Sequence, residues 1–244
     1  MAIEPGISCG KCEWCIRGKP NLCPFVKFLG TPPVNGAFRD YIVMPEKNLV
    51  KIPDGLGFEE GVLSEPLAIG LYGVKLSKLE VGDDVAILGA GPIGLSTLFS
   101  VKAGGAKKIF VSDLLQPRLR FAKKIGADFV FLAKKEDVVG EILKLTDGRG
   151  VDIAYEAAGE EETFKQITEI ARIGGKSVIY GIPADDKIEF TANIVRRKEL
   201  TVINVRRSAH TTFLALELMK NSDLPFSSII THRFPFEKIE EGLN

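Results

Sequence analysis

Residues 85–95 read Val-Ala-Ile-Leu-Gly-Ala-Gly-Pro-Ile-Gly-Leu, an apolar run that passes through three glycines into a second apolar run. A short apolar run bounded by glycine is typical of a buried strand, and the G-x-G-x-x-G spacing is typical of a tight turn that opens a helix. Further apolar runs begin near residues 109, 129, 153, 177 and 200, with helix-like segments between them. This alternation predicts an α/β fold with a doubly wound sheet of six parallel strands.

The three glycines predict a binding site for a dinucleotide. Gly89 permits the tight turn, Gly91 lets the backbone approach a pyrophosphate, and Gly94 lets the helix pack closely on the strand. The helix N-terminus offers free N–H groups to the phosphates. Asp113 ends the next strand, nineteen residues after Gly94, close to the spacing expected for a carboxylate that binds the adenosine ribose. Because a carboxylate repels a 2′-phosphate, the sequence favours NAD over NADP.

Two features near this motif leave alternatives open. Arg118 lies five residues after Asp113 and could run along the adenosine, or it could be an ordinary solvated arginine on a helix. A similar glycine turn occurs in flavodoxin-like and methyltransferase domains. The strand, the helix and the acidic residue are all in register here, which favours the dinucleotide.

The cysteines predict a metal site. All four lie within fifteen positions, at Cys9, Cys12, Cys15 and Cys23. Four thiolates on a tight loop suit a tetrahedral zinc whose coordination is complete, and such a site is structural. A four-iron cluster is the main rival, because C-x2-C-x2-C and Cys23-Pro24 are similar to a ferredoxin motif. Seven residues precede the last cysteine where that motif has three, and there is no second set of cysteines. Free structural cysteines are a third interpretation.

Composition excludes some classes of partner. The formal net charge is zero, 26% of the residues are charged and 45% are hydrophobic, so a nucleic-acid partner is not expected. No apolar run approaches the length of a membrane span, and the first residues do not read as a signal peptide. A cytoplasmic location follows, which agrees with metal-binding rather than disulfide-bonded cysteines.

The rest of the chain predicts flanking elements. Residues 1–53 are loop-rich and contain one strand-like run at 38–44. A helix is expected over about 59–79. Within it, Ser64-Glu65-Pro66 also reads as a helix start with Ser64 as its cap. A helix over 211–221, a strand over 228–234 and a helix start at 237 follow. The apolar edge strand at 200–205 predicts pairing with another subunit, in a homodimer or homotetramer.

Five segments together resemble the zinc-containing medium-chain dehydrogenases over nearly the whole chain. They are GISCGKCEWCIRGKPNLC (6–23), GAFRDYIVMPEKNLVKIPD (36–54), SEPLAIGLYGV (64–74), VAILGAGPIGL (85–95) and SDLLQPRLRFAKKIGAD (112–128). Within that family, Glu65-Pro66 and residues 204–207 and 231–236 look most like the sorbitol and related polyol dehydrogenases. The resemblance implies a partial GroES-like catalytic domain with a zinc lobe (1–65), an NAD-binding Rossmann domain (66–208) and a truncated return segment (209–244).

The resemblance also implies roles for single residues. The cysteines would hold the lobe zinc, Glu65 would lie beside a catalytic zinc, and Arg206 would lie near the polyol and the nicotinamide. Arg206 and Arg207 could instead simply flank the edge strand, and His210 and His232 are expected at the surface. The NAD-binding positions would be Gly89, Gly91, Ile93, Gly94, Asp113 and Arg118.

The implied reaction is hydride transfer between a secondary alcohol, such as a polyol, diol or sugar alcohol, and NAD with zinc. Family members begin with a segment that supplies a catalytic cysteine and a Gly-His-Glu pair, and this chain has neither. We therefore expect a chain truncated at both ends, which binds NAD without zinc-dependent turnover. Two alternatives remain: a non-catalytic NAD-binding module with a structural zinc, and an iron–sulfur electron carrier.

Overall fold

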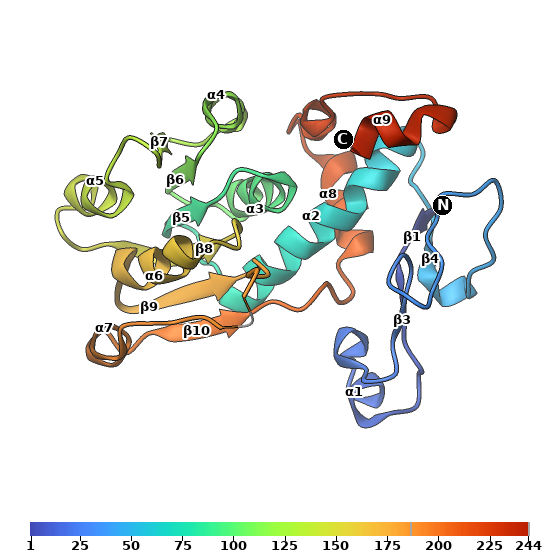
Figure 1. The fold of residues 1–244 in the computed structure, drawn as a ribbon, viewed down its shortest axis with the longest axis horizontal. Helices are drawn as coiled ribbons and strands as arrows, with labels where there is room; N and C mark the ends of the chain where they lie inside the picture. The colour runs from blue at the N-terminus through green and yellow to red at the C-terminus, as the bar shows by residue number, and fades with distance from the viewer. Residues whose placement is uncertain (186, 244) are drawn as a thin grey trace.

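The centre of the molecule is a six-stranded parallel sheet, seen in the computed structural model, which describes residues 1–185 and 187–243 (Figure 1). The strand order is β10-β9-β8-β5-β6-β7, so the direction of winding reverses between β5 and β8. The predicted doubly wound fold is confirmed. The strands are β5 (Asp84–Leu88), β6 (Lys108–Asp113), β7 (Phe129–Leu132), β8 (Val151–Glu156), β9 (Ala171–Ile179) and β10 (Thr201–Asn204).

Each face of the sheet has its own hydrophobic core, because alternate residues of a strand point to opposite faces. Val85 and Ile87 of β5 pack with α2 (Phe58–Ser77), α3 (Pro92–Ala103), α4 (Gln116–Ile125) and α8 (Thr212–Asn221). Ala86 and Leu88 pack on the other face with α5 (Val138–Leu145) and α6 (Glu161–Ile170). The short α7 (Ala192–Arg197) leads into the edge strand β10. Burial on both faces explains why the strands are almost continuously apolar.

Helix α2 confirms the helix expected over about 59–79. It is continuous across Ser64-Glu65-Pro66, so the alternative interpretation of a helix start there is wrong. The helix begins at Phe58, and Gly57 precedes it with its N–H bonded to Glu60 Oε2 at 2.9 Å. A proline inside a helix costs about 3 kcal/mol. Burial of one face of α2 and close packing on α3 offset this cost: a Cβ on Gly70 would lie 2.7 Å from the backbone of Ser96. The helix also crosses the expected domain boundary between residues 65 and 66.

The N-terminal region contains two small antiparallel pairs. β1 (Ala2–Ile3) pairs with β4 (Leu49–Val50), and β2 (Gly6–Ile7) pairs with β3 (Lys27–Phe28), next to the short α1 (Glu13–Ile16). The N-terminal region also contains the 3₁₀ turns η1 (Pro20–Leu22) and η2 (Glu46–Asn48). The strand predicted over 38–44 is wrong. No described strand pairs with this run, and Tyr41 and Val43 are 91% and 97% exposed. A strand without a partner has no ladder to stabilise it.

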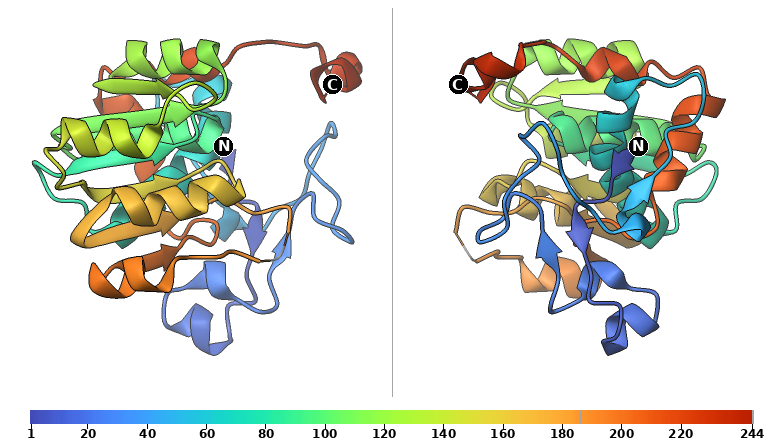
Figure 2. Two further views of the ribbon diagram at one scale, coloured as in Figure 1. Left: turned by 60° about the vertical axis from the view of Figure 1, so that its left-hand side comes forward. Right: turned by 90° about the vertical axis from the view of Figure 1, so that its right-hand side faces the viewer.

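The C-terminal region confirms α8 and corrects the strand predicted over 228–234. That segment contains η3 (Phe226–Ile229) and then irregular chain, followed by η4 (Phe236–Lys238) and α9 (Ile239–Leu243). Phe226 is buried against Phe99, with ring centroids 4.5 Å apart, which anchors the 3₁₀ turn on α3. Figure 2 shows α9 standing away from the sheet. None of the described helices combines the length and the apolar character needed to cross a bilayer.

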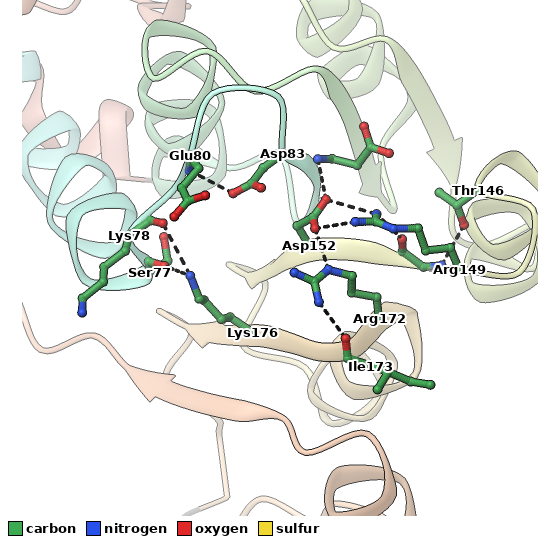
Figure 3. Close-up of polar contacts among 12 residues, drawn as sticks. Ser77, Lys78, Glu80, Asp83, Thr146, Arg149, Asp152, Arg172, Ile173 and Lys176 are labelled. Carbon is green, nitrogen blue, oxygen red and sulfur yellow. Dashed lines mark hydrogen bonds and ion pairs between the residues drawn. The ribbon is translucent and has the colours of Figure 1, made fainter.

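An ion-pair network joins the strands at their amino ends (Figure 3). Asp152, at the start of β8, accepts the backbone N–H of Asp84 on β5 at 2.9 Å. Arg149 Nη2 and Arg172 Nε each lie 2.6 Å from Asp152 Oδ1. One carboxylate therefore connects β8 to β5, to the start of β9 through Arg172, and to the loop before β8 through Arg149. This end of the sheet is opposite to the glycine-rich turn.

Candidate functional site

The glycine-rich turn follows β5 and has the geometry that its glycines predict. Gly89 has a φ of +104°, and a Cβ there would lie 2.8 Å from the carbonyl of Ala157. A Cβ on Gly94 would lie 1.9 Å from the carbonyl oxygen of Gly89. Gly91 precedes the first turn of α3, and the nearest atom to its virtual Cβ is Arg118 Nη1 at 3.9 Å. The first and third glycines are thus required by packing, and the second leaves open space above the helix N-terminus.

Asp113 is held in place at the end of β6. Its Oδ2 accepts the N–H of Ala90 in the glycine turn, and its Oδ1 accepts the N–H of Leu115, both at 2.8 Å. Arg118 Nη1 lies 3.5 Å from Oδ2, and the arginine side chain is half-exposed. The carboxylate still has free lone pairs for ribose hydroxyls. Arg118 is therefore partly solvated and also lies beside Asp113, and its role along the adenosine stays a prediction.

A cavity of about 540 Å³ connects these groups. It lies between the glycine turn (Gly89, Gly91), Asp113 with Arg118, and the loop that follows β8. Its walls therefore come from the carboxyl ends of β5, β6 and β8, where the order of the strands reverses. Ligands of doubly wound folds bind at that position. Ile93, on the first turn of α3, does not line this cavity.

The four cysteine sulfurs lie within 4.8 Å of one another, which confirms that the structure brings them together. Cys12 and Cys15 sulfurs are 3.5 Å apart, and those of Cys9 and Cys15 are 4.0 Å apart. Tetrahedral zinc with bonds of about 2.3 Å places its sulfurs about 3.8 Å apart, so the donor set fits zinc. The backbone N–H of Lys11 is the main cause that lowers the pKa of Cys9 to about 6, which favours its thiolate. The backbone N–H of Cys15 lowers the pKa of Cys12, but burial and the hydrogen bonds with the other cysteines outweigh it and raise that pKa to about 11.

Glu65 lies in α2 and is half-buried. Burial, and then the nearby carboxylate of Glu4, raise the pKa of Glu65. Thr212 donates a hydrogen bond of 2.5 Å to Glu4 Oε2. Among residues 1–185 and 187–243, the cysteine cluster is the one group of three or more ligand side chains that could share an ion. The described residues therefore do not make a three-ligand catalytic zinc site around Glu65.

A second cavity, also of about 540 Å³, lies between the cysteine lobe and the segment that follows β10. Arg207 lines it and places its guanidinium 4.4 Å from the centre of the Phe28 ring. The side chain of Arg206 is exposed instead, and its carbonyl accepts a hydrogen bond from Asn21 at 3.0 Å. The substrate role expected for Arg206 stays a prediction, and Arg207 is the arginine that faces this cavity. His210 is exposed, as expected, and so is His232.

One buried acid escaped the sequence analysis. Glu156 ends β8 and has no exposed surface. The available signal was an acidic residue at the end of an apolar strand, directly before Ala-Ala-Gly.

Comparisons with known proteins agree with this geometry. The sequence model described as "Zinc-binding dehydrogenase" matches residues 92–221, and that of the "Alcohol dehydrogenase GroES-like domain" matches residues 1–54. Sorbitol dehydrogenase of Bacillus subtilis is 37% identical over 243 residues, which cover 100% of this chain and 69% of that protein. The chain belongs to the zinc-binding dehydrogenase family.

Solved structures of similar proteins contain nicotinamide cofactors. A zinc-binding dehydrogenase of Sinorhizobium meliloti 1021, bound to NADP, has a TM-score of 0.84 and 33% identity, over 95% of this chain and 66% of that one. An alcohol dehydrogenase of Escherichia coli CFT073, complexed with NADH, has a TM-score of 0.91 and 28% identity, over 99% and 71%. This dehydrogenase chain therefore belongs to a family of enzymes that use zinc and a nicotinamide cofactor. The preference for NAD over NADP that Asp113 predicts stays a prediction.

Proposed function

We propose that this chain is an NAD-dependent dehydrogenase that acts on the secondary alcohol of a polyol, diol or sugar alcohol. The observation that carries the proposal is Asp113, a buried carboxylate fixed by two backbone N–H groups at the edge of the glycine-turn cavity. The similarity to sorbitol dehydrogenase supports a polyol as the substrate class. Bound NAD supplies the acceptor for the hydride that leaves the alcohol carbon.

The residues of the chain bind and orient that cofactor. The turn at 89–94 and the N-terminus of α3 offer N–H groups to the pyrophosphate. Asp113 accepts hydrogen bonds from the adenosine ribose, with Arg118 beside it, and disfavours a 2′-phosphate by charge. The four cysteines hold a structural zinc that crosslinks the loop over residues 9–23. We expect thiolates of this kind to stay reduced in the cytoplasm.

A second candidate function is an NAD-binding module without zinc-dependent turnover. It is favoured by the ligand geometry, because the described residues gather no set of zinc ligands around Glu65. A catalytic zinc normally has three protein ligands and one open position. This candidate keeps the cofactor site and the cysteine zinc and removes only the chemical step.

Binding and turnover measurements distinguish the two. The purified chain is titrated with NADH and NADPH at fixed salt, and NAD reduction is followed with sorbitol and xylitol, with and without a chelator. If NADH binds at least about tenfold more tightly than NADPH, the cofactor assignment is supported. Chelator-sensitive NADH formation then supports the dehydrogenase, and binding without it supports the module. Equal affinities for the two cofactors would contradict the role of Asp113.

We also propose that the chain forms a homodimer or homotetramer through β10. This strand pairs on one side with β9, through Thr201 to Asn204, and is the last strand of the sheet. An edge strand of this kind is a template for pairing with a second copy. Light scattering measures the mass directly, and Val202→Pro should reduce it to that of a monomer because proline removes a ladder N–H. A monomeric wild-type chain would contradict the proposal.

A further inference from the structure

Glu156 is a fully buried carboxylate that accepts four hydrogen bonds at the carboxyl end of β8. Its Oε1 accepts the N–H groups of Ala158 at 2.8 Å and Gly159 at 2.7 Å, and the hydroxyl of Thr163 at 2.8 Å. Three donors from one loop and the following helix therefore converge on a single oxygen. A buried charge is tolerated when donors surround it in this way.

The second oxygen joins this loop to another part of the sheet. Glu156 Oε2 accepts the N–H of Gly181, which follows β9, at 3.1 Å. A Cβ on Gly181 would lie 2.1 Å from that oxygen and 2.6 Å from the Cα of Gly159. The loops after β8 and β9 are therefore packed at a distance that a side chain on Gly181 would disrupt.

The same loop also packs on the glycine turn. The N–H of Ala157 bonds to the carbonyl of Leu88 at 2.8 Å, and Ala157 leaves no room for a Cβ on Gly89. The loops after β5, β8 and β9, three neighbouring strands in Figure 1, thus form one continuous layer of contacts. Glu156 lies at its centre and contacts two of the three loops.

A dinucleotide lies across the point where the strand order reverses, with one mononucleotide on each side. Asp113 on β6 marks the adenosine side. The nicotinamide mononucleotide then lies on the side of β8 and β9. We propose that Glu156 is a positioning residue that holds the loops after β8 and β9 in the geometry that receives the nicotinamide half of NAD. This inference rests on the NAD-binding function proposed above.

The substitution Glu156→Gln affects the two sets of hydrogen bonds differently, those to the β8 loop and the following helix and the one to the β9 loop. An amide can keep its oxygen towards the three donors from the β8 loop and the following helix, but its NH₂ group then faces the N–H of Gly181, where two donors meet. The link to the β9 loop is lost while the β8 loop stays anchored. Preorganised loops bind more tightly than loops that must be ordered on binding. We therefore expect NADH to bind about tenfold more weakly to this variant.

The experiment compares NADH with ADP-ribose, which lacks the nicotinamide ring. Dissociation constants are measured by calorimetry, and NADH binding is also followed by its fluorescence. Glu156→Gln should weaken NADH about tenfold and ADP-ribose by less than about threefold. Gly181→Ala, which strains the same contact without changing the acid, should show the same pattern. It provides a second test if Glu156→Gln does not fold.

Asp152→Asn is the matched control. Asp152 lies on the same strand, is also buried and also accepts several hydrogen bonds, but at the opposite end of the sheet. It should lower thermal stability without changing the ratio of the NADH and ADP-ribose affinities. Equal weakening of both ligands by Glu156→Gln and Gly181→Ala, or no weakening, would overturn the positioning role. If the wild-type chain binds neither ligand, the cofactor site itself fails, and the positioning role fails with it.

Discussion

Asp152→Asn should destabilise the folded chain in a way that depends on pH. Asp152 accepts one backbone N–H from Asp84, and its carboxylate pairs with Arg149 and Arg172 (Figure 3). Burial raises the pKa of Asp152, but the hydrogen bonds from the two arginines and Asp84 outweigh it, and the pKa falls from 3.8 to about 2.

The size and sign of the effect follow from that pKa. A shift from 3.8 to about 2 corresponds to about 2 kcal/mol of stabilisation of the ionised form. The arginine side chains are 49% and 35% exposed, so solvent screening reduces this to about 1 to 2 kcal/mol. Because the folded pKa is depressed, the contribution is present above the unfolded pKa. It is lost as the pH falls from about 4 to about 2.

Urea unfolding at several pH values measures this contribution. The wild-type chain should be more stable than Asp152→Asn by about 1 to 2 kcal/mol at pH 7, and the difference should shrink steadily below pH 4. Asp223→Asn, which changes an exposed carboxylate, should differ from the wild type by less than about 0.5 kcal/mol. A difference for Asp152→Asn that is the same at pH 7 and pH 3 would refute the ion-pair explanation.

Three further predictions concern the metal and the cofactor. Cys12→Ser should lower bound zinc from one per chain to none and make residues 6–24 sensitive to protease, because the metal is the main crosslink of that loop. Metal analysis that finds iron, or two zinc ions, in the wild type would contradict the assignment of the cysteine site. Asp113→Ser should narrow the preference for NADH over NADPH to less than about threefold, since the repelling charge is gone; an unchanged ratio in calorimetry would show that another group discriminates. Gly94→Ala should cost about 1 to 3 kcal/mol of stability and weaken NADH binding at least tenfold, because its Cβ would lie 1.9 Å from the carbonyl oxygen of Gly89. If the variant bound NADH with the affinity of the wild type, the turn would have to move to make room for the methyl group.

The central sheet was predictable because its signals are local. Each strand is a short apolar run, each helix separates two such runs, and the spacing from Gly94 to Asp113 spans one such unit. All six predicted strands occur in the structure; five lie within about two residues of their expected bounds, and β9 begins six residues earlier than predicted. The cysteine cluster was predictable for the same reason, since all its ligands lie within one loop.

The errors occur where a structure depends on a distant partner. Residues 38–44 have the composition of a strand, but no described strand pairs with them, and the same holds for 228–234. Ser64 and Pro66 have the local pattern of a helix start, yet packing of α2 on α3 keeps the helix continuous. The helix or strand propensity of a short segment contributes less than a few kcal/mol to the free energy of folding, so tertiary packing can outweigh it.

By itself, the sequence determined the kind of fold, the glycine turn with its acid and the set of cysteines, because neighbouring residues encode each of them. Only the tertiary structure decided that Glu156 would join the loops of β8 and β9, and that Arg207 rather than Arg206 would face a cavity. Gly181 lies 25 residues from Glu156 along the chain, and Phe28 is farther still from Arg207. Such contacts exist only when separate segments are packed together, so no periodicity in the sequence records them.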